Sequence, residues 1–323
     1  YFVNQLVDRE GEPLAVASIA DWEEKRTRVL AAMQGVMGSL PGEEKRCALE
    51  VEVEEEVDCG SYVRQLLSYS AEPGGRVPAF LLVPKGNGPF PAVLCPHPTS
   101  NTEGHKVVVG LGEKPNRSYA SELAERGFVT LAPSYPLLAN YQPDWCALGY
   151  ESATMKAIWD NMRGLDLLEG MDCVAAGGFG SIGHSLGGHN SIYTAVFDPR
   201  IKAVVSCCGF DSYQDYKDGD IDGWASDRYM PKLLHYALAD IPFDFHDMVA
   251  ALAPRPFLAV APLHDANFKW QSVDRIAAAA ARVFALYGAQ DALAVEHPDC
   301  EHDFPDAMRE LSYQLFEQYL GIA

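Results

Sequence analysis

The sequence predicts an α/β fold, in which a mostly parallel mixed sheet is flanked by helices and begins with antiparallel strands. From residue 90 onward, short apolar runs alternate with amphipathic stretches, a pattern typical of a sheet covered by helices on both faces. Residues 47–83 instead contain strand-like runs, two of them joined by the turn signal EPGG, which indicates antiparallel pairing. A glycine-rich run, GHSLGG at 183–188, lies between a predicted strand and a predicted helix.

Residues 1–45 are expected to form an irregular lead and one helix. We expect Asp21 to cap this helix, with Glu24 three residues on as the second half of a capping box. Gly38 and Pro41 are expected to end it. Its apolar face is formed by three residues at helical spacing: Val29, Met33 and Val36.

The antiparallel region begins with apolar residues that alternate with Glu, which predicts a half-buried strand. These apolar residues are Leu49, Val51, Val53 and Val57. Two further strands are expected over 61–70 and 76–83, on either side of the turn signal.

The alternating region supplies the parallel strands and the helices that cover them. Strands are expected over 91–95, 128–132, 178–183, 203–207, 256–261 and 292–296. Helices are expected over 118–126, 151–169, 186–197, 270–287 and about 304–320. Residues 209–250, rich in Asp, Tyr and Trp, interrupt this rhythm and are expected to form a cap-like insertion over the carboxyl edge of the sheet, where ligands bind. We therefore expect one domain over residues 1–323, with 1–45 as an N-terminal helical extension.

The composition excludes several classes of partner. Asp and Glu total 45 against 25 Lys and Arg, for a formal charge of -20. Nucleic acids and anionic membranes require a basic footprint, so neither is expected as a partner. The chain has no run of about 18 apolar residues that would predict a membrane-spanning helix. The oligomeric state is left open.

The compartment is predicted from the cysteines and from the start of the chain. The eight cysteines show no CxxC and no paired spacing, which favours a reducing, cytoplasmic location. The first residues, YFVN, contain no signal-peptide pattern. They also lack an initiator Met, so a processed secreted or periplasmic form stays open.

The run GHSLGG carries the strongest chemical signal. A strand, a tight turn of the form G-x-S-x-G and a helix form a nucleophile elbow. The flanking residues Gly183 and Gly187 are small, as this turn requires. The helix dipole and free amide groups near Ser185 favour developing negative charge. We therefore expect Ser185 to be a nucleophile rather than a bystander in a glycine-rich turn.

A serine nucleophile requires a base, and in this arrangement the chain order is serine, acid, histidine. His302 follows the last predicted strand and is the expected base, with His297 as second choice. Asp265 follows the preceding strand and is the expected acid. Asp291 is a weaker alternative because it precedes its strand. The remaining histidines are expected to be structural (His184, His189), near substrate (His235, His246), beside the acid without a role (His264) or unplaced (His105), and Asp299 and Asp303 are expected to be solvated.

The oxyanion hole requires two amide donors. Leu186 is the first, because it follows the nucleophile. Thr99 is our choice for the second, since its neighbour Pro98 has no N–H. Four residues are predicted to bind substrate: His97, Tyr135, Trp145 and Trp224. No metal and no cofactor is expected, since the possible zinc trio of His297, Cys300 and His302 lacks a fourth ligand with standard spacing.

Over roughly residues 60–320 the chain resembles the α/β-hydrolase superfamily. Within it, the chain resembles the dienelactone hydrolase and acetyl xylan esterase-like branch, which is related to the catalytic domains of prolyl-oligopeptidase-type peptidases. The stretches that carry the resemblance are RVPAFLLVPKG, FPAVLCPHPT, YASELAERGFVTLAPSYP, IGHSLGGHN, DPRIKAVVSCCGF, PLHDANF and CEHDFP. Many relatives have His-Gly where this chain has His97-Pro98, which puts the second oxyanion donor in doubt. Relatives often carry Asp at the position of Ser134, a difference without an expected catalytic consequence.

The resemblance implies a serine esterase that hydrolyses carboxylic esters through an acyl-enzyme. It suggests a short acyl group, such as acetyl on a carbohydrate. Two alternatives stay open. A peptidase of the prolyl-oligopeptidase kind would use the same triad, but such enzymes usually carry a propeller that 323 residues cannot also hold. A non-catalytic binding protein on the same fold normally loses a triad member, and here all three are present.

Overall fold

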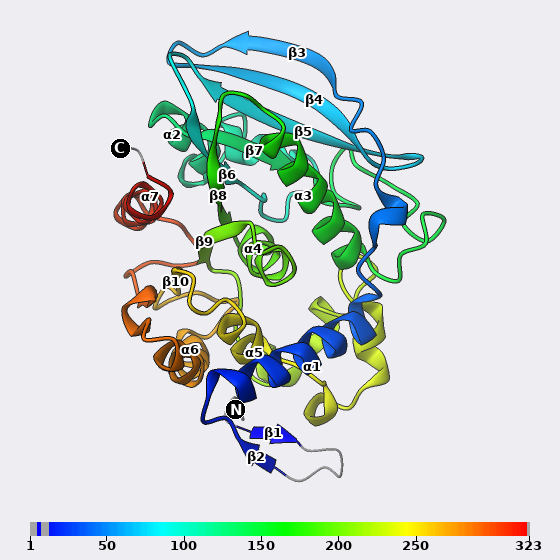
Figure 1. Cartoon of the computed structure of the whole chain (residues 1–323), viewed down its shortest axis with the longest axis vertical. Helices are drawn as coiled ribbons and strands as arrows, with labels where there is room; N and C mark the ends of the chain where they lie inside the picture. The colour runs from blue at the N-terminus through cyan, green and yellow to red at the C-terminus, as the bar shows by residue number, and fades with distance from the viewer. Residues whose placement is uncertain (1–4, 8–12, 322–323) are drawn as a thin grey trace.

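A nine-stranded sheet runs through the molecule in the order β11-β10-β9-β8-β6-β7-β5-β4-β3 (Figure 1). Neighbouring strands from β7 to β11 are parallel, whereas β3, β4 and β5 are antiparallel. The strands are β3 (Glu52–Asp58), β4 (Tyr62–Glu72), β5 (Gly75–Pro84), β6 (Phe90–Leu94), β7 (Val129–Pro133), β8 (Val174–His184), β9 (Ile201–Cys207), β10 (Phe257–Val260) and β11 (Leu293–Glu296). This arrangement confirms the predicted fold class.

The structure is a computed structural model that describes residues 5–7 and 13–321. The expectation about the first four residues of the chain lies outside the described residues. A separate antiparallel pair, β1 (Gln5–Val7) and β2 (Pro13–Ala15), was not predicted from the sequence. Within the described residues, no helix combines the length and the apolar character needed to cross a membrane.

Two helical layers cover the sheet (Figure 1). The apolar core on one face joins α1 (Ile19–Met37), α3 (Ala153–Glu169), α4 (Leu186–Phe197), α5 (Phe245–Ala250) and α6 (Trp270–Leu286) to the strands. The core on the other face joins α2 (Tyr119–Glu125) and α7 (Asp306–Leu320). Successive residues of β6 point to opposite faces, so that Leu94 belongs to the first core and Val93 to the second. The predicted helices and parallel strands are therefore confirmed, with ends shifted by a few residues.

Two predictions about the N-terminal region are wrong. Helix α1 is capped by Ser18, whose hydroxyl accepts a hydrogen bond from the amide of Asp21 at 3.2 Å. Asp21 is instead the third helical residue, and its carboxylate accepts a hydrogen bond from the amide of Ser18 at 2.9 Å. Strand β3 is not half-buried, because it lies at the sheet edge and pairs with β4 alone; the side chain of Val53 is about half exposed. Its glutamates give this edge the negative charge that discourages pairing with another chain.

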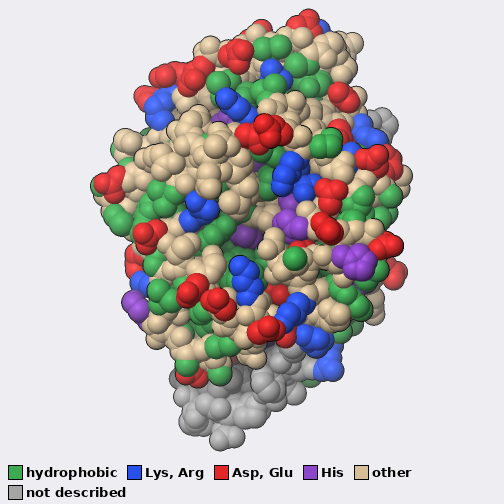
Figure 2. Space-filling view, turned by 180° about the vertical axis from the view of Figure 1, so that it is seen from behind, with side chains coloured by type: hydrophobic (Ala, Val, Ile, Leu, Met, Phe, Trp, Pro, Cys, Tyr) green, Lys and Arg blue, Asp and Glu red, His purple; other side chains and the backbone are tan. Residues whose placement is uncertain are grey.

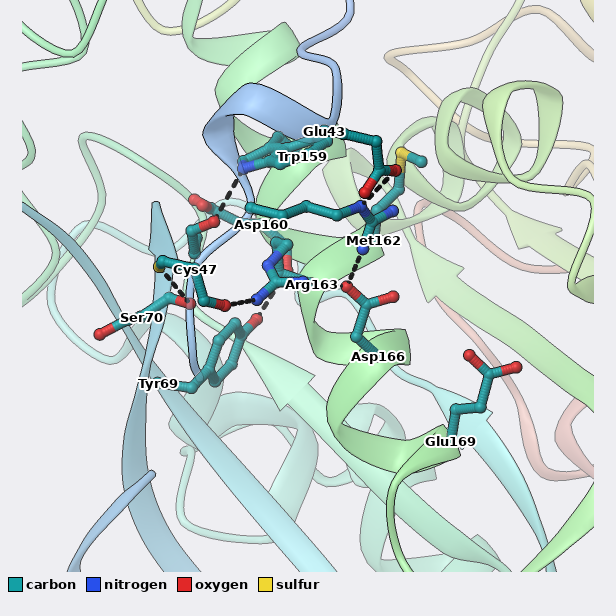
Figure 3. A network of polar contacts seen from close by, with 12 residues as sticks. Glu43, Cys47, Tyr69, Ser70, Trp159, Asp160, Met162, Arg163, Asp166 and Glu169 are labelled. Carbon is teal, nitrogen blue, oxygen red and sulfur yellow. Dashed lines mark hydrogen bonds and ion pairs between the residues drawn. The ribbon is translucent and has the colours of Figure 1, made fainter. Parts of the chain in front are cut away.

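Polar contacts attach α3 to the antiparallel strands (Figure 3). Trp159 donates its indole N–H to the carbonyl of Ala71 at 3.0 Å, and the hydroxyl of Tyr69 donates to the carbonyl of Asp160 at 2.8 Å. Arg163 donates to the carbonyl of Cys47 at 2.5 Å. Each contact satisfies a backbone carbonyl between α3 and either β4 or the segment before β3, which ties the antiparallel region to the helix.

The ammonium of Lys156 is fully buried in the same region. It pairs with Glu72 at 3.0 Å and with Asp160 on the next turn of α3. Burial raises the pKa of Asp160 to about 6, against the opposing effect of Lys156. Removing the only lysine between two buried carboxyl groups leaves their charge uncompensated.

Replacing Lys156 with Met is therefore expected to lower the free energy of unfolding by about 3–5 kcal/mol. Urea unfolding monitored by circular dichroism measures this loss. The matched control is Lys232→Met, which breaks the partly exposed pair with Glu151 and is expected to cost no more than about 1 kcal/mol. Equal losses in the two variants would contradict the interpretation.

Candidate active site

Ser185 lies in the sharp turn between β8 and α4. Its backbone has φ 54° and ψ -120°, a left-handed conformation that costs energy for any residue but glycine. A Cβ on Gly183 would overlap the carbonyl of Gly187, and a Cβ on Gly187 would overlap the carbonyl of Pro96. The amide of Ser185 donates to the carbonyl of Cys207 at 2.8 Å, which fixes the turn to β9. This strained turn has the geometry of a nucleophile elbow.

His302 and Asp265 meet above the carboxyl edge of the sheet. Asp265 follows β10, and His302 lies in the loop between β11 and α7. The Nδ1 atom of His302 is 2.9 Å and 3.0 Å from the two carboxylate oxygens of Asp265. The amide of Asn267 also donates to Asp265 at 2.8 Å, and the carboxylate is almost fully buried. The acid is thus held in place to orient the imidazole.

The loop that carries His302 is anchored by Arg117, which is nearly buried. Its guanidinium donates to the carbonyl of His302 at 2.9 Å and pairs with the carboxylate of Asp303. Asp303 also accepts a bond from Asn116 at 2.7 Å. The prediction that Asp303 is a solvated loop residue is therefore wrong, because this carboxylate ties the loop to the segment before α2.

No hydrogen bond joins Ser185 to His302 among the described residues, although His302 contacts the residue that precedes Ser185. The ring of His184, the residue before the nucleophile, lies with its centroid 4.6 Å from that of His302. Catalytic hydrogen bonds are often long or poorly aligned when no substrate is bound. The structure therefore contains the His302–Asp265 half of the predicted triad and brings His302 beside the elbow, while the complete triad stays a proposal.

Comparisons with known proteins agree with this arrangement. No family model matches the chain. A Bacillus subtilis (strain 168) protein named as a hydrolase, YtaP, is 25% identical over 257 residues, which are 76% of this chain and 84% of that protein. A glucuronoyl esterase from Solibacter usitatus superposes with a TM-score of 0.77 at 19% identity, covering 97% of this chain and 95% of that one. An acetyl xylan esterase from Paenibacillus sp. R4 superposes with a TM-score of 0.62 at 17% identity, covering 95% and 96%.

The chain has the α/β-hydrolase fold. This fold uses a nucleophile elbow between a strand and a helix, followed by an acid and a histidine after later strands. The chain has the elbow between β8 and α4, Asp265 after β10 and His302 after β11.

The environment of His302 raises its basicity. Burial lowers the pKa of the imidazole, but the hydrogen bond to Asp265 and the adjoining Cys208 thiol outweigh burial and raise the pKa to about 9. Burial also raises the pKa of the Cys208 thiol well above its ordinary value. His302 is consequently protonated at neutral pH.

Ester hydrolysis is therefore expected to speed up as the pH rises toward about 9. A general base must be unprotonated, so below its pKa the value of kcat/KM should rise about tenfold per pH unit. Initial rates between pH 6 and pH 10 in buffer with a metal chelator, corrected for spontaneous hydrolysis, measure this profile. A profile that is already flat from pH 7 would contradict the raised pKa of His302.

In the hydrolase fold, the oxyanion hole is formed next to the elbow. Leu186 is the first residue of α4, so its amide has no acceptor within the helix. The loop after β6 contacts the elbow through Pro96, as the overlap at Gly187 shows. Thr99 follows in this loop, is exposed, and has its hydroxyl 3.4 Å from that of Tyr229. The roles of Leu186 and Thr99 as donors remain predictions.

Two of the predicted substrate residues lie beneath the loop rather than on its surface. His97 is buried, donates from Nδ1 to the carbonyl of Pro98 at 2.7 Å and accepts at Nε2 from the amide of Tyr135 at 2.9 Å. Burial lowers the pKa of His97 to about 4, so the ring is neutral. The hydroxyl of Tyr135 donates to the carbonyl of Arg228 at 2.8 Å. These contacts shape the loop and connect it to the insertion.

The two predicted tryptophans lie in different surroundings. Trp145 packs against the main core in the long connection before α3 and makes no ring contact among the described residues. Trp224 is buried in the insertion, where its ring contacts those of His189 (4.7 Å between centroids), Tyr229 (6.1 Å) and Phe268 (6.1 Å). Phe268 in turn lies 6.1 Å from His302. An aromatic wall of Trp224, Tyr229 and Phe268 therefore extends from the base to the loop of Thr99.

Of the described part of the chain, one face has histidine side chains around a central hollow, with Lys and Arg side chains beside it (Figure 2).

The other histidines are held outside the predicted triad. His297 bonds to the carbonyl of Ala261 and to Asp274, so it is not placed as the base. His264 is exposed and pairs with Asp299 at 2.9 Å. His105 lies in a 3-10 helix, Gly104–Val109, where it contacts the hydroxyl of Ser134. The insertion histidines show no contact with the triad among the described residues: His235 is exposed, and His246 lies 3.4 Å from Asp247.

The residues that sequence reasoning missed come from other parts of the chain. Tyr229 has no local signal, because the insertion lacks periodicity. Phe268 lies three residues after Asp265, so its only sequence signal is that it closely follows the predicted acid.

Two groups of described side chains are close enough together to hold a metal ion, and neither includes His297. The first group is His184, Cys207 and Cys208, and the second is Cys208, Asp265 and His302.

Proposed function

We propose that this protein is a serine hydrolase of carboxylic esters, with Ser185 as nucleophile, His302 as base and Asp265 as the acid that orients it. The observation that carries the proposal is the strained serine elbow beside a histidine–carboxylate pair, in the chain order of the hydrolase fold. The relatives with esterase names support the reaction class.

The reaction proceeds in two steps through an acyl-enzyme. His302 removes the proton from the Ser185 hydroxyl as the oxygen attacks the ester carbonyl, and the imidazolium is stabilised by Asp265. The amides of Leu186 and Thr99 bind the oxyanion; one such donor is typically worth about 3–4 kcal/mol in the transition state. His302 then protonates the leaving alcohol. A water molecule, deprotonated by His302, releases the acid.

We further propose that the alcohol part of the substrate is a carbohydrate and the acyl part is short. The aromatic wall supports a sugar, because the half-buried rings of Tyr229 and Phe268 provide flat apolar faces near the base, while Trp224 is buried against them. The hydroxyls of Tyr229 and Thr99 lie together at its exposed end, where they can bond to sugar hydroxyls. The matched structures with names of glucuronoyl and acetyl xylan esterases support the same substrate class.

A substrate panel tests this proposal. The purified chain is given p-nitrophenyl esters from acetyl to long acyl, acetylated xylan and an aminoacyl p-nitroanilide. We expect kcat/KM to be highest for acetyl esters and activity on the sugar acetate. Replacing Tyr229 with Ala should raise KM for the sugar acetate more than for p-nitrophenyl acetate. The matched variant His264→Ala removes an exposed ring that makes no contact with the aromatic wall among the described residues, and it should change neither. Preferred cleavage of the anilide would favour the peptidase alternative, and no turnover together with no fluorophosphonate labelling would favour a binding protein.

A further inference from the structure

Two cysteines and a histidine meet directly behind the catalytic residues. His184 ends β8 and Cys207 ends β9, and the two residues are partners in the parallel register of these strands. Cys208 follows with φ 48°, a turned backbone that brings its sulfur next to that of Cys207. All three side chains are buried. The triad uses none of them as nucleophile, acid or base.

The spacing of these side chains matches a metal site. The sulfur atoms of Cys207 and Cys208 are 3.6 Å apart. Two thiolates on a tetrahedral zinc ion, each at about 2.3 Å, lie about 3.8 Å from each other. One ligand atom from each of His184, Cys207 and Cys208 lies within 4.8 Å of the others. Small movements would therefore bring all three to coordination distance.

The histidine of this cluster lacks the partners that a buried imidazole normally has. Neither ring nitrogen of His184 makes a well-aligned hydrogen bond among the described residues, although the ring is only about 2% exposed and lies near the backbone of His302. Leaving a buried polar group unsatisfied costs about 1–3 kcal/mol. Burial lowers the pKa of His184 well below its ordinary range, so the ring is neutral, the form that binds metal ions. The thiols of Cys207 and Cys208 both donate to the carbonyl of Asp303, at 3.5 Å and 3.3 Å, so neither has a strong hydrogen-bond acceptor of its own.

We propose that His184, Cys207 and Cys208 form a binding site for a thiolate-preferring divalent cation such as Zn²⁺ or Cd²⁺, and that its occupation inhibits the enzyme. On binding, each thiol releases its proton to the buffer and each sulfur donates an electron pair to the cation. The two thiolates balance the charge of the cation, so the filled site is neutral despite its burial. Soft sulfur ligands select Zn²⁺ and Cd²⁺ over Mg²⁺ or Ca²⁺.

Inhibition follows from the position of His302. Its ring lies against His184 at 4.6 Å between centroids, and a ligand atom of His302 lies within 4.8 Å of the Cys208 sulfur. A cation held by Cys208 either takes His302 as its fourth ligand or repels the imidazolium that catalysis requires. The binding half of the inference stands alone, whereas the inhibition half rests on the proposed function.

Cadmium titration of the chelator-treated full chain tests binding without any assay of activity. We expect an ultraviolet thiolate-to-cadmium charge-transfer band that saturates at one ion per chain. Cys207→Ser should weaken binding at least tenfold, since even an outer-sphere partner of a metal site is typically worth about 10–100-fold. The matched control is Cys95→Ser, a buried cysteine just after β6 on the same face of the sheet, which should leave the titration unchanged. No band in the native chain, or equal bands in the two variants, would overturn the site.

A zinc titration of ester hydrolysis then tests inhibition. We expect Zn²⁺ to inhibit the native chain and the Cys95→Ser variant equally, and the Cys207→Ser variant at concentrations at least about tenfold higher. Cadmium binding with unchanged turnover would overturn inhibition and leave the site standing. Cadmium binding in a chain that never hydrolyses esters would count against the proposed function instead. Should Cys207→Ser fail to fold, as judged by circular dichroism, Cys208→Ala provides the same comparison.

Discussion

Replacing Ser185 with Ala is expected to lower kcat for ester hydrolysis by about 10⁴- to 10⁶-fold, because the acyl-enzyme can no longer form. Residual activity would come from the oxyanion donors and from binding alone. The loss should appear in kcat with little change in KM, since alanine at the elbow leaves the substrate surface intact. Initial rates of p-nitrophenyl acetate hydrolysis measure the effect, at an enzyme concentration high enough to detect the residual activity.

A second serine on the same helix gives the matched control for this variant. Ser191 lies in α4 and is fully buried, and its hydroxyl makes no hydrogen bond within the described part of the chain. Losing an unsatisfied buried hydroxyl is nearly neutral for stability, so Ser191→Ala should retain activity and react with a fluorophosphonate. Ser185→Ala should fold equally well and not react. Hydrolysis that survives Ser185→Ala at more than a hundredth of the native rate would refute Ser185 as the nucleophile.

Replacing Asp265 with Asn is expected to lower kcat by about 10⁴-fold. The amide has nearly the size of the carboxylate, but it can donate a hydrogen bond to Nδ1 of His302 and so stabilise the wrong tautomer. It also removes the bond that helps to raise the pKa of His302 to about 9. The remaining activity should therefore reach its plateau at a lower pH than that of the native enzyme. A full pH profile of kcat/KM for the variant measures both effects.

An exposed aspartate–histidine pair close to Asp265 in the chain provides the control. Asp299 pairs with His264 at 2.9 Å, and both side chains are largely exposed. Asp299→Asn should leave both the rate and the pH profile unchanged. If Asp265→Asn retains a tenth or more of the native kcat, another carboxylate supports His302 and the assignment fails.

Features set by residues close together in the chain are the ones that the sequence predicts well. The elbow is a short-range feature, because the turn at Ser185 requires glycines two residues before and after it. The acid and the base were placed by counting strands, and the structure brings Asp265 and His302 within 3.0 Å. The alternating pattern before residue 60 led to the wrong prediction of a half-buried strand. Alternation shows that the two faces of a strand differ in polarity, but it does not show that a helix covers one of them. Val53 stays about half exposed for that reason.

Features that depend on distant segments were out of reach of the sequence. Tyr229 contacts the loop of Thr99 from 130 positions along the chain, and nothing in the insertion indicates which of its aromatic residues turns inward. The sequence predicts Asp303 to be a solvated loop residue, because nothing in it indicates the ion pair with Arg117. The contacts of Lys156 and Arg163 that hold α3 in place likewise depend on segments that lie about 80–120 residues before them in the chain.

The sequence by itself determined the α/β fold class, the strained elbow at Ser185 and the order of Ser185, Asp265 and His302 after successive strands. These follow from backbone sterics and from hydrophobic periodicity, which act between residues near in the chain. Only the tertiary structure decided that Cys207 and Cys208 lie with His184 behind the base and that an aromatic wall stands beside it. Burial, ring contacts and sulfur–sulfur distances arise when the carboxyl ends of β8, β9 and β10 meet, and strand register sets them with a precision that composition and spacing do not encode.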